Sequence, residues 1–215
     1  MNREELLKNA KPILFNTEMV QAILEGRKTV TRRIIKPQPN NIEMLNGVFS
    51  NGLLKIFYDF DEEINIKAPY EVGDILYVRE TWYYENHMHD LIAGEPDLPN
   101  GEYSHRYVYR ASSPDYPVNV GVGKHGWMPS IHMPKIAARI FLKVTYIRVE
   151  RLQGITEGQA YKEGTTLPSP RANYVNSFIS LWDGTIKKQD LDKYGWEANP
   201  WVWIIEFEKK EREEK

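Results

Sequence analysis

The sequence predicts an α+β protein built around a small mixed β-barrel. Five or six segments have the patterns of strands and three or four have helical periodicity, without a regular alternation between the two. With 215 residues, 41% of them apolar, the chain is long enough to bury the core of one elaborated domain. We expect a single domain over residues 1–215, with loop-rich insertions at about 40–70 and 85–130.

The N-terminal elements are short. Residues 3–9 favour a helix, and residues 11–15 favour a short strand. Residues 17–25 place apolar side chains on one helical face, and Gly26 follows at the position where a glycine commonly ends a helix. The β-branched and basic residues 27–35 are typical of a strand, which the prolines after it terminate.

Turn residues divide the middle of the chain. Two Asn-Gly pairs, at positions 46–47 and 51–52, predict a small hairpin within residues 42–58. A Gly-Asp turn precedes residues 75–80, which favour a strand. The second insertion is rich in Gly, Pro, Asn, His and aromatic residues, and its one clear strand pattern covers residues 106–110.

The C-terminal part carries the strongest strand pattern, at residues 139–151. Its apolar side chains fall on both faces, which predicts a central strand. Thr156 and Gln159 have capping-box spacing and open a short helix that Gly164 closes. The remaining expected elements are a helix over 172–187, a strand over 201–207 and a solvated charged tail over 208–215.

Composition excludes several classes of protein. The absence of cysteine excludes disulfide frameworks, thiolate zinc sites and a cysteine nucleophile. A net charge of −2 argues against bulk binding of long nucleic acid, although a local basic pocket remains compatible with it. No apolar run approaches the length of a membrane span, and the N-terminus lacks the pattern of a signal peptide. We therefore expect a cytoplasmic protein without a membrane partner.

The strongest candidate for chemistry is a basic segment that surrounds two threonines. Cationic side chains near a turn can anchor phosphates or carboxylates, and a hydroxyl adds hydrogen bonding or a nucleophile. The alternative is a solvated edge strand whose charges prevent aggregation. The segment consists of Gly26, Arg27, Lys28, Thr29, Val30, Thr31, Arg32 and Arg33.

A second candidate segment lies between two prolines. Rigid placement of Trp127, His132 and Lys135 suits stacking on a base and contact with its phosphate, although a structural loop explains the pattern equally well. His87 and His89 have no nearby residues that complete a metal site, and we expect neither a metal nor a cofactor.

Arg79, Glu80 and Trp82 end a predicted strand together. They form either the wall of a site or an Arg79–Glu80 ion pair beside a packed tryptophan. The chain has no glycine-rich phosphate loop, no G-x-S-x-G elbow and no H-E-x-x-H motif. Chemistry on nucleoside triphosphates and serine-hydrolase chemistry therefore have no support in the sequence.

Four segments, in this order and spacing, resemble the ASCH domain family. The whole chain is also similar to the longer ASCH proteins common in phages and prophages, in which GRKT-x-TRR, Arg-Glu-Thr-Trp, W-x-PS-x-HMP and NPWVW recur. The resemblance implies a PUA-like fold, which is a small β-barrel with peripheral helices. The four segments are residues 23–33, 72–78, 155–163 and 203–207.

The resemblance also implies a function. It implies binding of RNA or a modified nucleoside, and one shorter bacterial branch removes the acetyl group from N4-acetylcytidine with a Lys, a Thr and a Glu. By motif these residues fall on Lys28, Thr31 and Glu163, which implies an amidohydrolase with Thr31 as nucleophile, Lys28 as base and Glu163 as acid. This chain departs from that branch in its Arg32-Arg33 pair and its insertions.

Two alternatives remain open, namely a non-catalytic RNA-binding module and a ribonuclease that uses the same basic cleft with His132 as base. In each case we expect Lys28, Thr31, Arg32 and Glu163 to converge beside the barrel. The expected ligand-binding side chains are Arg27, Arg32, Arg33, Arg79, Trp82, Trp127, His132 and Lys135.

Overall fold

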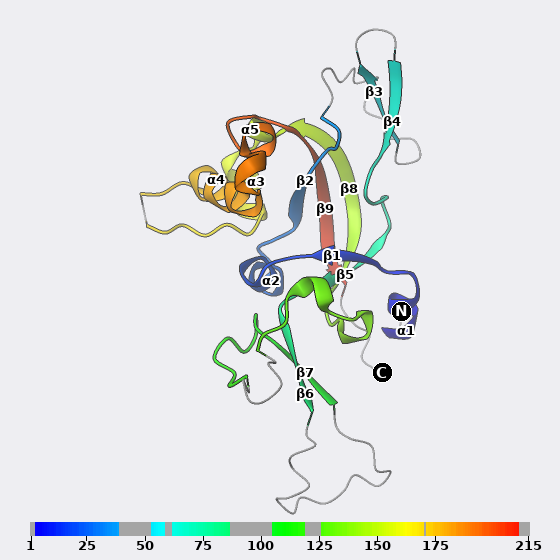
Figure 1. Ribbon diagram of the computed structural model, residues 1–215, viewed down its shortest axis with the longest axis vertical. Helices are drawn as coiled ribbons and strands as arrows, with labels where there is room; N and C mark the ends of the chain where they lie inside the picture. Colours follow the sequence, from blue (N-terminus) through cyan, green and yellow to red (C-terminus); the bar gives the residue numbers. More distant parts are fainter. Residues whose placement is uncertain are drawn as a thin grey trace, which may run out of the picture.

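A five-stranded mixed sheet forms the centre of the computed structural model, which describes residues 3–38, 53–58, 62–86, 105–118, 126–169 and 171–210 (Figure 1). Its strand order is β1-β5-β8-β9-β2; β1 and β5 are parallel, and the other neighbours are antiparallel. The strands are β1 (Lys11–Leu14), β2 (Val30–Ile34), β5 (Ile75–Arg79), β8 (Phe141–Arg151) and β9 (Trp201–Lys210).

The two edge strands, β1 and β2, do not pair with each other among the described strands. The structure therefore confirms the α+β class, and the sheet it describes is open rather than a closed barrel. Two antiparallel hairpins lie outside this sheet. They are formed by β3 (Leu53–Tyr58) with β4 (Glu62–Lys67), and by β6 (Trp82–Asn86) with β7 (His105–Tyr109).

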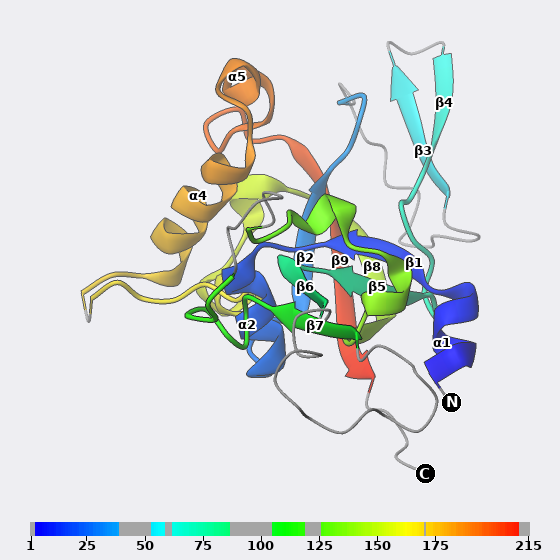
Figure 2. The ribbon, with the colours of Figure 1, turned by 60° about the horizontal axis from the view of Figure 1, so that its bottom comes forward.

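The helices lie on different sides of the sheet (Figure 2). The group α3, α4 and α5 lies on one side, beside β2 and β9, whereas α1 lies at the far end of β1 (Figures 1 and 2). The helices are α1 (Arg3–Asn9), α2 (Thr17–Leu24), α3 (Glu157–Lys162), α4 (Tyr174–Thr185) and α5 (Leu191–Tyr194). Short 3-10 turns are η3 (Ser130–His132), η4 (Lys135–Ala137), η5 (Leu152–Gly154) and η6 (Lys188–Asp190).

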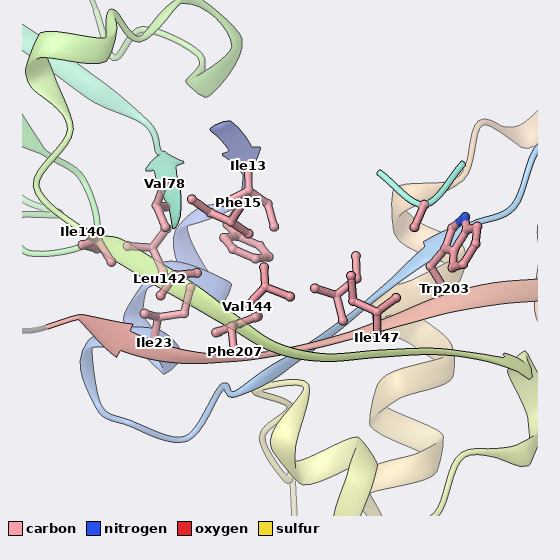
Figure 3. Close-up of a cluster of buried hydrophobic side chains, with 14 of the residues drawn as sticks. Ile13, Phe15, Ile23, Val78, Ile140, Leu142, Val144, Ile147, Trp203 and Phe207 are labelled. Carbon is pink, nitrogen blue, oxygen red and sulfur yellow. The ribbon is translucent and has the colours of Figure 1, made fainter. Parts of the chain in front are cut away.

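The two long strands β8 and β9 separate two apolar clusters. On one face, Phe15 and Phe207 pack with side chains of β1, β5 and β8 (Figure 3). On the other face, Val30 and Ile204 pack beneath Phe178 of α4 and its neighbours. Burial on both faces agrees with the apolar side chains that β8 carries on each face and with its position in the middle of the sheet.

Local signals in the sequence fixed most element boundaries. Asn16 caps α2 by accepting a hydrogen bond from the Met19 amide, and Gly26 follows with a φ of 76°. The predicted capping box at Thr156 and Gln159 is present. The helices predicted at 3–9, 17–25 and 172–187, and the strands at 11–15, 75–80, 106–110 and 139–151, are confirmed within one or two residues.

Other expectations need correction. The hairpin expected within 42–58 forms instead between residues 53–58 and 62–67, and both Asn-Gly pairs lie outside the described residues. The strand at 27–35 begins only at Val30 because the residues before it continue the turn after α2. The strand expected at 201–207 extends to Lys210, where long pairing with β8 orders part of the predicted tail. No sequence pattern had predicted β6 or α5.

Candidate functional site

Lys28 lies in the short connection between α2 and β2. The backbone amides of Arg27 and Lys28 both donate to the Ala22 carbonyl, which closes the end of α2. Gly164, with a φ of 88°, brings the end of α3 against this turn. A Cβ on Gly164 would lie 2.7 Å from the Ala22 Cβ and 3.1 Å from the Lys28 Cβ, so only glycine permits this approach.

The Lys28 ammonium is completely buried and has three hydrogen-bond acceptors. It donates to the Val30 carbonyl at 2.9 Å, to the Glu163 carbonyl at 2.7 Å and to Glu163 Oε2 at 2.8 Å. These bonds use all three donors of an ammonium group. Burial lowers the pKa of Lys28, and the charge and hydrogen bond of Glu163 oppose that shift.

Arg32 contacts the same carboxylate from β2. Its Nη1 donates to Glu163 Oε1 at 2.9 Å, and its Nη2 donates to Gln159 Oε1 at 3.2 Å. The guanidinium lies over the Phe178 ring, 5.6 Å from the ring centroid. Its Nε is buried without a hydrogen-bond partner in the described part of the chain. The capping-box residue Gln159 thus also orients a buried arginine.

Lys28, Arg32 and Glu163 form a buried network with more positive than negative charge, which we call the Lys28 cluster. Each side chain is at most 3% exposed. A further carboxylate, that of Glu150, lies 3.9 Å from Arg32 Nη2. A buried ion pair is weak evidence for stability, because apolar replacements of similar volume are often neutral or stabilising. The network therefore suggests a role beyond packing.

Thr31 and Arg33 point to the opposite face of β2 from Arg32, because side chains alternate along a strand. Thr31 is 2% exposed, and its hydroxyl has no hydrogen bond within the described residues. Arg33 donates from Nη2 to the Leu14 carbonyl at 3.0 Å, which links the edge strand β2 to the edge strand β1. Arg33 and the Lys28 ammonium lie 5.4 and 5.3 Å from the centroid of the same Phe15 ring.

Arg27 contributes to the frame of the cluster. It pairs with Glu25 at 2.6 Å and donates from Nη1 to the Gly164 carbonyl at 3.0 Å. The end of α3 is thus held by Arg27 and by Lys28, which both donate to carbonyls there. Cations at this end of a helix satisfy carbonyls that have no partner within it.

The other predicted ligand-binding residues gather around residues 127–135. Arg79 donates to the Met133 carbonyl at 3.1 Å and also to the Ile131 carbonyl. Lys135 lies over the Tyr77 ring, 5.4 Å from its centroid, and His132 is exposed on η3. Trp127 is half-buried against Tyr83, whereas Trp82 is buried in a third apolar cluster that includes Leu6 of α1 and Met133.

The expected alternative of an Arg79–Glu80 ion pair is wrong. Neighbouring strand residues point to opposite faces, so Glu80 turns inward and forms two 2.8 Å bonds with Arg139. Arg139 in turn lies over the Tyr109 ring, 4.1 Å from its centroid. Sequence reasoning also missed Phe15 and Gln159 as neighbours of the Lys28 cluster. The capping box is the only sequence signal that pointed to Gln159.

Of the four residues expected to converge, Glu163 contacts both Lys28 and Arg32, whereas the Thr31 side chain has no hydrogen bond to any of the three among the described residues. No group of three or more residues able to hold a metal ion occurs in the described ranges, and His87 and His89 lie outside them. Among the same residues, no helix is both long and apolar enough to cross a membrane. Comparisons with family models, curated proteins and solved structures found no match.

Proposed function

We propose that this chain is an ASCH-type protein that binds RNA or a modified nucleoside and hydrolyses an N4-acetylcytidine-like amide. One observation carries the proposal, namely the 2.8 Å contact between Lys28 and Glu163. These residues lie 135 positions apart and belong to two separate motifs of the resemblance. The same ammonium donates to the carbonyl of Val30, the residue before Thr31, which supports a shared site without showing a contact of the Thr31 hydroxyl with either residue.

The proposed reaction begins with proton transfer from the Lys28 ammonium to the Glu163 carboxylate. The neutral Lys28 amine then accepts the hydroxyl proton of Thr31 as its oxygen attacks the acyl carbon. Glu163 returns its proton to the departing exocyclic amine, and an acyl-threonine remains. Water attacks that ester, regenerates the threonine hydroxyl and releases the carboxylic acid.

Substrate binding must change two features of the site before this reaction can begin. Lys28 must release one of its three acceptors, because its donors are all occupied. The Thr31 hydroxyl must also become reachable, because the residue is 2% exposed. A substrate that enters between the edge strands β1 and β2 would meet Thr31 and Arg33 on the same face of β2.

The same occupied donors favour a second candidate function, a non-catalytic RNA-binding or modified-base-binding module. In that case Lys28 is a fixed cation that positions Glu163 and the end of α3. The ribonuclease alternative depends on His132, which η3 places beside Arg79 rather than among the contacts of Lys28. No observation on the described residues favours it over the other two.

The test separates binding from catalysis at Lys28 and Thr31. Wild type, Lys28→Arg, Lys28→Ala and Thr31→Ala are compared for binding of N4-acetylcytidine and for release of acetate. Thr29→Ala serves as the matched hydroxyl control, because Thr29 lies in the same motif before β2. Circular dichroism and thermal melts confirm that each variant is folded.

The hydrolase proposal expects Lys28→Arg and Thr31→Ala to lose about 10²–10⁴-fold in rate, while Thr29→Ala retains it. Arginine stays charged at any working pH and cannot act as the base. No acetate release from wild type, together with wild-type binding by Lys28→Arg, would refute the hydrolase and support the binding module. Loss of binding by Thr31→Ala without loss of turnover would refute the role of Thr31 as nucleophile.

A further inference from the structure

The Glu163 carboxylate is shared between two buried cations. Its Oε2 accepts from Lys28 at 2.8 Å, and its Oε1 accepts from Arg32 Nη1 at 2.9 Å. Arginine stays charged at any working pH, whereas a lysine can lose its proton. With Lys28 protonated, the Lys28 cluster holds two cations and one anion, and the loss of one proton leaves its charges balanced. Arg32 therefore favours the state in which that proton has been released.

Two further side chains determine how strongly the charge of Arg32 acts on Glu163. Nη2 of Arg32 donates to Gln159 Oε1 at 3.2 Å and lies 3.9 Å from the Glu150 carboxylate. Gln159 is neutral, so it orients the guanidinium without compensating its charge. The Glu150 side chain is 28% exposed and lies beyond hydrogen-bond distance of Arg32, so water weakens the compensation that it supplies.

The other charged groups around Lys28 do not remove this positive excess. Burial is the main reason for the lowered pKa of Lys28, and the charge and hydrogen bond of Glu163 oppose it. The charge of Arg33, also on β2, lowers this pKa further. In the turn before β2, Arg27 and Glu25 pair with each other at 2.6 Å and so contribute little net charge. Among the described residues, Glu163 is therefore the one carboxylate in contact with Lys28.

We propose that Arg32 is a positioning residue that controls how readily the Lys28–Glu163 pair gives up a proton. Gln159 and Glu150 set the strength of this control, the first by staying neutral and the second by partly compensating the guanidinium. The inference rests on the proposed function, because that proton is the one delivered to the departing exocyclic amine. Two ionisable groups in direct contact titrate as one unit, so Arg32 acts on the pair rather than on either residue alone. A cation beside the pair makes it a stronger acid.

The experiment changes the charge beside Arg32 in opposite directions. Gln159→Glu adds a negative charge where Nη2 now meets a neutral amide, and glutamate at this position preserves the capping box. Glu150→Gln removes a negative charge and keeps an oxygen that can accept from Arg148. The titration of Lys28 is followed by NMR of its ε-methylene group in protein labelled with ¹³C-lysine, and Lys28→Met assigns the signal. Acetate release from N4-acetylcytidine is measured over the same pH range.

Two matched controls carry the same charge changes away from Arg32. Gln189→Glu adds a negative charge on the exposed turn η6. Glu206→Gln removes a carboxylate that pairs with Arg148 at the other end of the same charged network, and within the described residues Glu206 forms no ion pair with Arg32. Circular dichroism and thermal melts show whether each variant is folded.

Gln159→Glu should raise the midpoint of the Lys28 titration by about one pH unit, because it compensates Arg32 directly. Glu150→Gln should lower the midpoint by about half a pH unit, since water screens the carboxylate that it removes. The two controls should keep the wild-type midpoint. Where acetate is released, the alkaline limb of the pH–rate profile should move with the midpoint, because the pair must still hold the proton that it delivers. A purely structural role of these residues would not move the two midpoints in opposite directions.

The outcomes separate this inference from the proposed function. If both variants move the midpoint no further than their controls, or if Lys28 does not titrate between about pH 5 and pH 11, the control by Arg32 is refuted even when wild type releases acetate. If the midpoints move in opposite directions but wild type releases no acetate, the control by Arg32 stands and the hydrolase falls. If Gln159→Glu does not fold, Glu150→Gln decides alone, and an unchanged or raised midpoint refutes the inference.

Discussion

Replacing Glu163 with glutamine should strongly destabilise the protein. The substitution keeps the size of the side chain but removes the carboxylate that lies 2.8 Å from Lys28 and 2.9 Å from Arg32. Two cations, each at most 1% exposed, would then be buried without their shared counter-charge. Removing one partner of a buried ion pair costs about 3–5 kcal/mol. For a chain of this size, that loss corresponds to a fall in Tm of roughly 6–20 °C.

The assay is urea unfolding followed by tryptophan fluorescence and circular dichroism, because the chain has six tryptophans. The matched control is Glu71→Gln, which breaks an exposed ion pair with Lys67 at 3.2 Å. That pair lies in solvent, so its loss should cost less than about 1 kcal/mol. A double variant, Lys28→Met with Glu163→Gln, should cost less than the two single changes added together, because the residues are in direct contact.

A small effect would refute this reasoning. If Glu163→Gln costs no more than Glu71→Gln, the Lys28 cluster is hydrated or rearranged in solution rather than buried as described. If the single and double variants are strictly additive, Lys28 and Glu163 are not coupled. Either result would also remove the contact on which the proposed function depends.

Two further predictions concern the same turn. Because burial lowers the pKa of Lys28, the unfolded chain binds more protons than the folded chain between the lowered value and about 10.4, so stability should rise with pH there. Wild type should therefore gain stability relative to Lys28→Met in urea unfolding as the pH rises toward about 10. A shrinking difference would show that pairing with Glu163 outweighs burial. Gly164→Ala should cost about 2–4 kcal/mol, because its φ is 88° and the new Cβ would lie 2.7 Å from the Ala22 Cβ. Gly26 has a φ of 76° but open space where a Cβ would lie, so Gly26→Ala should cost only about 1–2 kcal/mol. If Gly164→Ala and Gly26→Ala lose the same stability in thermal melts, the steric contribution at Gly164 is refuted.

Local sequence signals were sufficient to predict much of the secondary structure of this chain. Caps, glycines and periodicity are properties of a few neighbouring residues, and they correctly placed α2, α3 and β8. The apolar residues on both faces of β8 even indicated its central position. Local signals were too weak to predict β6 and α5, because those short elements depend on contacts from distant parts of the chain.

The sequence also indicated which residues of the candidate site belong together, through motifs that resemble one family. It did not indicate that Lys28 has three acceptors, that Arg33 donates to the Leu14 carbonyl, or that Glu80 pairs with Arg139. These properties depend on which element packs on each face of a strand and on the close approach that Gly164 allows. The partners of buried charges depend on long-range packing, which local sequence patterns do not reveal.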